Sequence, residues 1–419
     1  MKVKNSCITS LKEEGAPIII VGAVQESEAV ANACSEIGIV ISAICDSEPT
    51  NEHNHNYRMK IEQICGLEVI HTPNLPKRFP KVRFIIGCQQ VQDVVEQLSG
   101  LGYHELYSPL ELLDNYDVYK HEHTVSQSYM VKRIEVAKKS HKAYFDDSKT
   151  YMRSVDVMLT TKCSLKCINC CNLMQYYTNP ENTDYEKILA ALEIIDKNVD
   201  DIAEFRVIGG EPLMNKGWAH IVNGISEKNA KRQIFIYTNG TIAPKEGQLE
   251  SFHGKNVNFI ITDYGKLSRN IDKLTDQLTK HAISFARTPA QDWVDCSSIT
   301  QHNRTTRENQ EVFKQCCAKY IYTLLDGKLY RCPFIANAAN LNAIQDNPAN
   351  YVNLFSKEDD VKQQIKRFVK AAKFFPGCDF CVGRPYDPTN SLGYDGKGLI
   401  PAGEQVAKNL PYKRYEVMP

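Results

Sequence analysis

Residues 163–170 have the sequence Cys-Ser-Leu-Lys-Cys-Ile-Asn-Cys, which places three cysteines in one short stretch. The thiolates of Cys163, Cys167 and Cys170 can each bind one iron of a cubane [4Fe–4S] cluster, and the fourth iron then has no protein ligand. Clusters that only transfer electrons usually have four cysteine ligands, so the triplet favours chemistry at the open iron. A tetrahedral zinc site is the alternative, with Cys171 as a fourth ligand.

The cysteines follow an expected strand at residues 155–159, and each of the next three expected strands ends in a small polar turn. These turns are Gly209-Gly210-Glu211-Pro212, Thr238-Asn239-Gly240 and Thr262-Asp263-Tyr264-Gly265. The carboxyl ends of parallel strands meet at one edge, where α/β proteins place active sites. In the first turn, two glycines let backbone carbonyls approach a ligand, and Glu211 offers negative charge to an ammonium group.

With these four motifs in this order, the chain from about Tyr151 onward resembles the radical S-adenosylmethionine (radical SAM) superfamily. The resemblance implies that the cysteine triplet holds a [4Fe–4S] cluster whose open iron chelates S-adenosylmethionine (SAM). The residues that it implies for SAM binding are Gly209, Gly210, Glu211, Pro212, Thr238, Asn239, Thr262 and Asp263. One departure is Asn169, because the superfamily usually has an aromatic residue there, near the adenine.

Strands alternate with helices along most of the chain, which predicts an α/β protein. We expect a doubly wound, Rossmann-like domain at residues 1–112, a solvated helical linker at 113–150 and a partial (β/α)6 TIM barrel at 151–300. Residues 301–419 are expected to form a small α+β domain. Within the barrel, Thr183-Asp-Tyr-Glu186 is expected to be a capping box that starts a helix.

The N-terminal domain carries only part of the signal for dinucleotide binding. After the expected strand at 17–22, Val24 and Ser27 replace the second and third glycines of the fingerprint, so NAD binding is not expected. Asp46 ends the next strand and could meet a ribose hydroxyl or cap a turn. The segments 84–90 and 98–109 resemble the small Rossmann-type domain fused to sugar-modifying enzymes of polysaccharide pathways. That resemblance implies a nucleotide-sugar or scaffolding role.

A second group of cysteines follows the barrel, with the spacing Cys-x15-Cys-x45-Cys-x2-Cys. Its members are Cys316 (or Cys317), Cys332, Cys378 and Cys381. Asp326-Gly327 predicts a β-hairpin between the first two of them. Four such ligands can hold zinc or a fully ligated cluster. Beside a radical SAM barrel, the arrangement resembles a twitch domain, a shortened SPASM domain with one auxiliary [4Fe–4S] cluster, and the family pattern favours Cys316 over Cys317.

Composition limits the other classes of function. The 419 residues include 50 basic and 50 acidic side chains, so no basic excess points to nucleic acid. The polar start and the short apolar run at residues 18–23 predict neither a signal peptide nor a membrane span. Among the 15 cysteines, the clustered ones are interpreted as ligands and the scattered ones as buried apolar residues. We therefore expect a cytoplasmic protein without a membrane partner.

The resemblance also implies a reaction. A reductant of the flavodoxin or ferredoxin type supplies an electron, SAM is cleaved to methionine and a 5′-deoxyadenosyl radical, and that radical abstracts hydrogen from the substrate. With an auxiliary cluster as electron acceptor, the expected outcome is oxidation of an alcohol to a ketone in a sugar, nucleotide sugar or related polyol. Epimerisation would instead need a hydrogen donor such as Cys171 or Cys296.

Two other classes of function stay open at this stage. One is a peptide-modifying radical SAM maturase, and the other is a non-catalytic iron–sulfur or zinc protein. The sequence identifies no catalytic residue. Tyr264 and Arg287 lie at strand ends, where a side chain could face a cavity.

Overall fold

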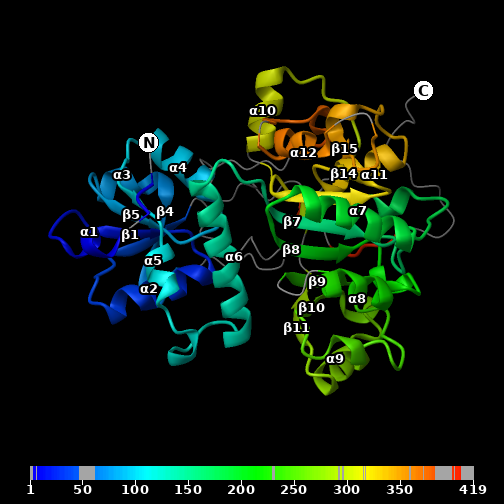
Figure 1. Cartoon of the computed structure of the whole chain (residues 1–419), viewed down its shortest axis with the longest axis horizontal. Helices are drawn as coiled ribbons and strands as arrows, with labels where there is room; N and C mark the ends of the chain where they lie inside the picture. Colours follow the sequence, from blue (N-terminus) through cyan, green and yellow to red (C-terminus); the bar gives the residue numbers. More distant parts are fainter. Residues whose placement is uncertain are drawn as a thin grey trace. The chain divides into compact units, whose positions relative to one another are not determined.

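The computed structural model divides the chain into two compact units (Figure 1). Most of the first unit is Met1–Ser148, and most of the second is Lys149–Tyr386. The structure describes residues 3–5, 7–46, 62–228, 232–290, 293–294, 297–314, 316, 318–357, 360–370, 372–382, 399–400 and 402–406. None of the helices within these residues is long and apolar enough to cross a bilayer.

The first unit contains one sheet whose strands lie in the order β3-β4-β2-β1-β5-β6. These strands are β1 (Ile18–Val21), β2 (Ala43–Asp46), β3 (Gln63–Ile64), β4 (Leu67–His71), β5 (Arg83–Ile86) and β6 (Leu106–Tyr107). Neighbours are parallel except for β3 with β4. The order reverses between β1 and β5, and such a reversal is the switch point of doubly wound α/β sheets.

Strand β1 lies between β2 and β5 in the sheet. All of its side chains are buried, alternately on the two faces of the sheet. Ile18 and Ile20 belong to one core, whereas Ile19 and Val21 belong to a second one. A parallel strand covered on both faces needs such a continuous apolar run. The helices of the unit are α1 (Ile8–Lys12), α2 (Gln25–Glu36), α3 (Leu75–Arg78), α4 (Val91–Gly100), α5 (Leu110–Asp114) and α6 (Gln127–Phe145).

Helix α6 corrects the expectation of a solvated linker. Met130 and Ile134 belong to the same core as Ile18. His141 is fully buried, with Nδ1 3.1 Å from the Ser108 hydroxyl and Nε2 3.1 Å from the Cys88 carbonyl oxygen. Burial lowers the pKa of His141 to about 4, so the ring is neutral at pH 7. The helix is therefore an integral part of the first unit.

Near the switch point, the carboxylates of Asp46 and Glu26 accept hydrogen bonds from other groups of the protein. Asp46 Oδ2 accepts the backbone N–H of Ala23 at 2.5 Å, which supports the turn-capping interpretation of Asp46. Glu26, in the first turn of α2, is fully buried, accepts a hydrogen bond from Gln89 at 2.5 Å and forms an ion pair with Arg133 at 2.9 Å. A buried carboxylate at a helix N-terminus occupies the place where a dinucleotide's pyrophosphate would bind.

The second unit contains a sheet with the order β11-β10-β9-β8-β7-β13-β14-β15 (Figure 1). Its strands are β7 (Tyr151–Met158), β8 (Asp201–Ile208), β9 (Gln233–Thr238), β10 (Val257–Asp263), β11 (Ser284–Pro289), β13 (Ile321–Leu325), β14 (Lys328–Tyr330) and β15 (Tyr351–Asn353). Strands β7 to β11 are parallel, and β13 is parallel to β7 on its other side. This parallel arrangement is consistent with a partial barrel, and β13–β15 continue its sheet.

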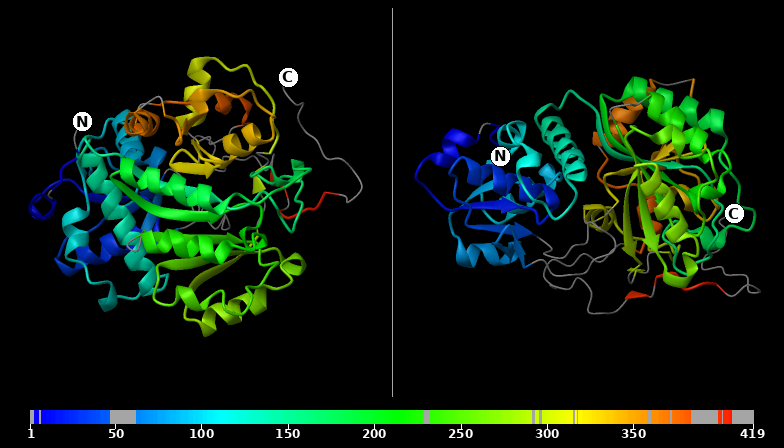
Figure 2. Two further views of the ribbon diagram at one scale, coloured as in Figure 1. Left: turned by 45° about the vertical axis from the view of Figure 1, so that its right-hand side comes forward. Right: turned by 90° about the horizontal axis from the view of Figure 1, so that it is seen from below.

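In the described part of this unit, six longer helices accompany the sheet, which Figure 2 shows from two further directions. They are α7 (Tyr185–Asn198), α8 (Trp218–Lys228), α9 (Ile271–Lys280), α10 (Thr306–Lys314), α11 (Pro333–Asn340) and α12 (Val361–Lys370). The predicted hairpin is confirmed, because β13 and β14 pair through Asp326 (φ 52°) and Gly327 (φ 77°). The predicted cap of α7 is wrong by one residue: Asp184 caps the helix, and the Thr183 hydroxyl donates to the Met158 carbonyl.

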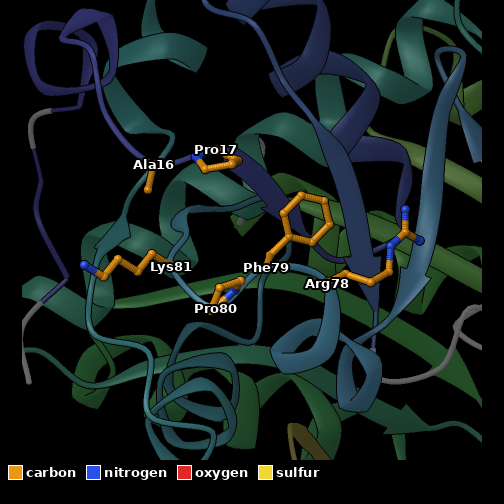
Figure 3. Close-up of a pocket in the computed structure, with 6 residues that line it drawn as sticks. All are labelled: Ala16, Pro17, Arg78, Phe79, Pro80 and Lys81. Carbon is orange, nitrogen blue, oxygen red and sulfur yellow. The ribbon is translucent and has the colours of Figure 1, made fainter.

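Two short strands form a separate pair, β12 (Trp293–Val294) with β16 (Leu399–Ile400). The pocket in Figure 3 lies in the first unit, has a volume of about 460 Å³ and is lined by Ala16, Pro17, Arg78, Phe79, Pro80 and Lys81. Arg78 is held in a bidentate pair with Glu68 at 2.7 and 2.9 Å. The pocket contains no cysteine and none of the predicted site residues.

A comparison of two glycines tests the contact between the ends of β1 and β5. A Cβ at Gly22 would lie 2.7 Å from the Cβ of Cys88, whereas a Cβ at Gly102 would meet nothing within 4 Å, and both glycines have positive φ. We expect Gly102→Ala to cost about 1 kcal/mol for its backbone conformation alone. Gly22→Ala should cost about 1–3 kcal/mol more. Hydrogen exchange of the β1 amides measures both, and equal effects would contradict the close contact.

Candidate active site

The cysteine loop (residues 159–173) leaves β7 beside the Gly-Gly-Glu-Pro turn that leaves β8. The parallel ladder continues past both strands: the N–H of Leu159 donates to Ile208, that of Gly210 to Thr160 at 3.0 Å, and that of Glu211 to Lys162 at 2.8 Å. The first cysteine is therefore fixed against the turn by backbone hydrogen bonds. This is the carboxyl edge of the sheet, as the sequence predicted.

Both glycines of the turn are required by this close approach. A Cβ at Gly210 would lie 2.3 Å from the carbonyl oxygen of Lys162 and 2.7 Å from the Cβ of Cys163. A Cβ at Gly209 would lie 2.5 Å from the carbonyl oxygen of Thr160. Contacts below 3.0 Å with backbone atoms cannot be relieved by a side-chain rotation, so any other residue would push the cysteine loop away.

The three cysteines of the triplet lie close enough to affect each other's ionisation. Burial, with a further contribution from Cys170, raises the pKa of Cys167 to about 12. The same two causes raise the pKa of Cys163 well above its ordinary value. Such thiols are protonated at pH 7 unless a metal binds them, and a coordinating metal deprotonates a thiol outright.

The described cysteines and other ligand-type residues contain no group of three that could hold a single metal ion. A cubane differs from a single ion because each cysteine binds a different iron atom. The three thiols of the triplet, with no histidine in the cysteine loop, fit three corners of a [4Fe–4S] cluster. Cys171, which directly follows the triplet, is exposed.

Glu211 connects the first turn to the second. Its fully buried carboxylate accepts hydrogen bonds from the Thr238 hydroxyl at 2.9 Å, the Asn239 backbone N–H at 2.8 Å and the Leu213 backbone N–H at 3.1 Å. Burial raises its pKa to about 7 although these donors act in the opposite direction. The side chain expected to meet an ammonium group therefore holds two turns together. Pro212 starts the short helix η4 (Pro212–Met214) directly behind it.

Asn239 reaches the cysteine loop from the end of β9. Its Nδ2 lies 3.2 Å from the Ser164 hydroxyl and 3.8 Å from Cys163 Sγ. Its backbone carbonyl accepts the hydroxyl of Ser268 at 2.6 Å, and Ser268 also binds the turn after β10 through the backbone N–H of Tyr264. Thr238 and Asn239 are thus brought to the cysteines, as predicted.

The turn after β10 has one buried and one exposed part. The Thr262 carbonyl lies 3.4 Å from the Ser268 hydroxyl. Asp263 Oδ2 accepts two hydrogen bonds from Arg287, at 2.9 and 2.7 Å, in a half-exposed ion pair. Burial, and then the neighbouring cysteines of the loop, raise the pKa of Tyr264 well above its ordinary value. Tyr264 therefore lies near the cysteines, whereas Arg287 bonds at the surface.

The second predicted group also comes together. Cys316 and Cys332 each accept a backbone N–H, from Ala318 at 3.4 Å and from Ile335 at 3.5 Å. Burial, with further contributions from Cys316 and Cys381, raises the pKa of Cys378 to about 12. Burial, and then the other three cysteines, raise the pKa of Cys332 well above its ordinary value. Cys317 and Cys296 lie outside the described residues.

Arg331 is a buried cation beside this group. Only 6% of it is exposed, and the rings of Tyr322, Phe313 and Phe375 surround its guanidinium at 4.5, 5.2 and 5.9 Å. Within the described chain it forms no ion pair with a carboxylate. Its Nη1 donates to the Ile321 carbonyl at 3.1 Å, so what it lacks is an opposite charge. A buried charge without an opposite charge is costly, and an anionic cluster on four thiolates would supply one. The donor set and this cation fit a fully ligated cluster.

Asp156 and Arg206 form a buried ion pair that the sequence analysis missed. They are register partners in β7 and β8, with Arg206 Nε 3.0 Å from Asp156 Oδ1, and the guanidinium lies 4.7 Å from the Tyr237 ring centroid. Their neighbours Val155 and Val157 point to the other, apolar face. Burial raises the pKa of Asp156 to about 6 although Arg206 acts in the opposite direction. The signal for this pair in the sequence was a single acidic residue, Asp156, within an apolar strand.

A match to a family model gives the class of the central domain. Residues 157–276 match the model of the Radical SAM superfamily, so the chain carries a radical SAM domain. GTP 3′,8-cyclase of Petrotoga mobilis is 30% identical over 100 residues, covering 23% of this chain and 30% of the relative. The enzyme of the same name from Thermodesulfovibrio yellowstonii is 32% identical over 105 residues, covering 23% and 31%. The chain therefore spans less than a third of the length of these curated relatives.

Several solved structures are similar to part of the chain, among them the following two. The first is BtrN in complex with AdoMet and 2-DOIA, with 16% identity and a TM-score of 0.37, covering 56% of this chain and 94% of that one. The second is anSMEcpe with bound AdoMet, with 10% identity and a TM-score of 0.33, covering 51% and 82%.

Gly210→Ala tests whether the close approach holds the cysteine loop. The methyl group would collide with the Lys162 backbone, so we expect the loop to move and anaerobically reconstituted protein to lose the iron held by the triplet, about four atoms per chain. Gly265→Ala, where a Cβ would meet nothing within 4 Å, is the matched control. Iron retention in Gly210→Ala equal to that of the control would contradict the assignment.

Glu211 predicts a pH dependence of stability. Because its pKa is about 7 in the folded protein and 4.5 ordinarily, the native state keeps a proton that the unfolded state has lost. Its contribution to stability is thus present below pH 4.5 and is lost as pH rises through 7. The loss is at most about 3 kcal/mol. In urea titrations of the apoprotein, the stability difference between wild type and Glu211→Gln should change in this window, whereas that for exposed Glu246→Gln should not.

Proposed function

We propose that this radical SAM protein oxidises a hydroxyl group of a sugar, nucleotide sugar or related polyol to a ketone. The observation that carries the proposal is that the second unit contains both the cysteine triplet and the second cysteine group. The triplet leaves one iron of a cluster open for SAM, whereas Cys316, Cys332, Cys378 and Cys381 would fully ligate an auxiliary one. An enzyme that only abstracts and returns hydrogen has no need of a second, closed electron acceptor.

When bound, SAM and the two [4Fe–4S] clusters would supply a hydrogen-abstracting radical and an acceptor for one electron. The chain itself must hold the substrate and accept a proton, because the substrate loses a hydrogen atom from carbon, a proton from its hydroxyl group and one electron. Asp156 is a candidate for the proton acceptor, because it is a buried carboxylate on β7, the strand that leads into the cysteine loop, and Arg206 holds it in place at 3.0 Å. A carboxylate whose pKa is about 6 is ionised at pH 7 and still basic enough to take a proton.

The remaining parts of the proposal concern the setting of the reaction. A flavodoxin- or ferredoxin-type reductant in the cytoplasm would supply the electron that starts each turnover. The region after residue 300 would be a twitch-like domain for the auxiliary cluster. The first unit would be a Rossmann-like domain with a nucleotide-sugar or scaffolding role, and its strand order supports a doubly wound sheet.

Other outcomes of the same radical chemistry have distinct requirements. Epimerisation needs a hydrogen donor, and Cys171, an exposed thiol directly after the triplet, could supply it. A peptide-modifying maturase would act on a peptide instead of a sugar. The GTP 3′,8-cyclases match about 100 residues, 23% of this chain, so they do not favour a substrate.

Metal analysis and SAM cleavage test the central assignment. Anaerobically prepared protein should contain about eight irons and eight sulfides per chain, and replacing the triplet by alanines should leave about four. With a strong reductant and SAM, wild type should release 5′-deoxyadenosine and the triple variant should not. About four irons in wild type, or no 5′-deoxyadenosine above background, would contradict the two-cluster enzyme.

Asp156→Asn tests the proton acceptor with a panel of UDP- and GDP-sugars as substrates. The variant should still cleave SAM, but its ketone formation should fall by about 100-fold or more because an amide accepts no proton. Wild-type ketone formation should rise with pH through about 6 as Asp156 ionises. Exposed Asp276→Asn is the control. Full ketone formation by Asp156→Asn would remove Asp156 from the reaction.

A further inference from the structure

The segment 402–406 lies across the cysteine loop, although Gln405 follows Cys167 by 238 residues in the sequence. Its backbone pairs with the loop in antiparallel fashion: the N–H of Ile168 donates to Glu404 at 2.8 Å, and the N–H of Val406 donates to Lys166 at 2.7 Å. Cys167 and Gln405 are the bridge partners between them. The middle cysteine of the triplet is therefore covered by a strap from the far end of the chain.

Gln405 has its side-chain amide fixed at both ends. Oε1 accepts the backbone N–H of Lys166 at 2.6 Å, and Nε2 donates to the Gly403 carbonyl at 2.6 Å. A backbone N–H can only donate and a carbonyl can only accept, so these two contacts determine which end of the amide is nitrogen. The second hydrogen of Nε2 is left for Cys167 Sγ, at 3.2 Å.

The strap is also anchored on Tyr264, beside the loop. Gly403 has φ +79°, and a Cβ there would lie 2.7 Å from Cδ1 of the Tyr264 ring. Trp293 of β12 packs edge-on against the same ring at 6.0 Å, and β12 pairs with β16, just before the strap. Val406 is 7% exposed. These contacts make the position of Gln405 a property of the fold.

We propose that Gln405 is a positioning residue that sets the reduction potential of the cluster on the triplet, and that the strap shields the Cys167 side of that cluster from water. The inference depends on the proposed assignment of a SAM-binding cluster to these cysteines. Reduction adds negative charge that the ligand sulfurs share, so an N–H donor to Cys167 stabilises the reduced state. Asn239 is a weaker second donor, 3.8 Å from Cys163 Sγ.

A potentiometric titration followed by electron paramagnetic resonance tests the role of Gln405. The relevant signal is the one that changes when SAM is added. Gln405→Leu should lower the ratio of reduced to oxidised cluster at a fixed potential about tenfold, which is about 59 mV for one electron. Gln405→Glu keeps the acceptor for Lys166 but places a carboxylate at the sulfur, so its ratio should fall further. Glu404→Ala, an exposed side chain on the same strap, should titrate like wild type.

Iron loss to a chelator gives a second readout that does not depend on activity. Both Gln405 variants should lose the SAM-responsive cluster several-fold faster than wild type and Glu404→Ala, with the second cluster unaffected. If Gln405→Leu binds no such cluster, Gln405→Glu carries the test. Titration and iron loss equal to those of wild type would overturn the inference while leaving the proposed function intact. Absence of a SAM-responsive signal in wild type would instead reject the proposed function.

Discussion

The close approach of Gly210 to the backbone of Lys162 is the constraint on which the site depends. It lets the β7–β8 ladder run past the ends of both strands, so that the first cysteine is fixed by backbone hydrogen bonds. Glu211 then transmits that position to the next turn, because its buried carboxylate accepts donors from Thr238 and Asn239. Rigid backbone, more than any single side chain, thus aligns the cysteines with the residues around them.

Features that depend on local sequence were predictable. The spacing of Cys163, Cys167 and Cys170, the Asp-Gly hairpin before Cys332 and the buried run of β1 each express a short-range rule, and the structure has the hairpin and the strand where these rules put them. The placement of the cysteine loop and the three polar turns at one sheet edge followed from strand alternation alone. The cap of α7 shows how far such rules reach, because Thr183 and Asp184 are both good caps and only the fold selects Asp184.

Features that depend on register and on distant contacts could not be predicted. Asp156 and Arg206 become a pair only through the alignment of β7 with β8, and Arg331 meets the second cysteine group only after the hairpin folds. Helix α6 has a polar sequence, yet its apolar stripe is buried in the first unit. Gln405 lies far from the triplet in sequence, and nothing in its surroundings indicated a contact with Cys167.

The central claim is that SAM binds the open iron of a cluster on the triplet, in a protein that holds a second, closed cluster. Mössbauer spectroscopy of 57Fe-enriched protein, with and without SAM, tests it most directly. The account predicts that SAM changes the isomer shift of about one iron in eight, because only the iron without a thiolate can expand its coordination. Spectra that are unchanged by SAM, or that show every iron with four sulfur ligands, would contradict it.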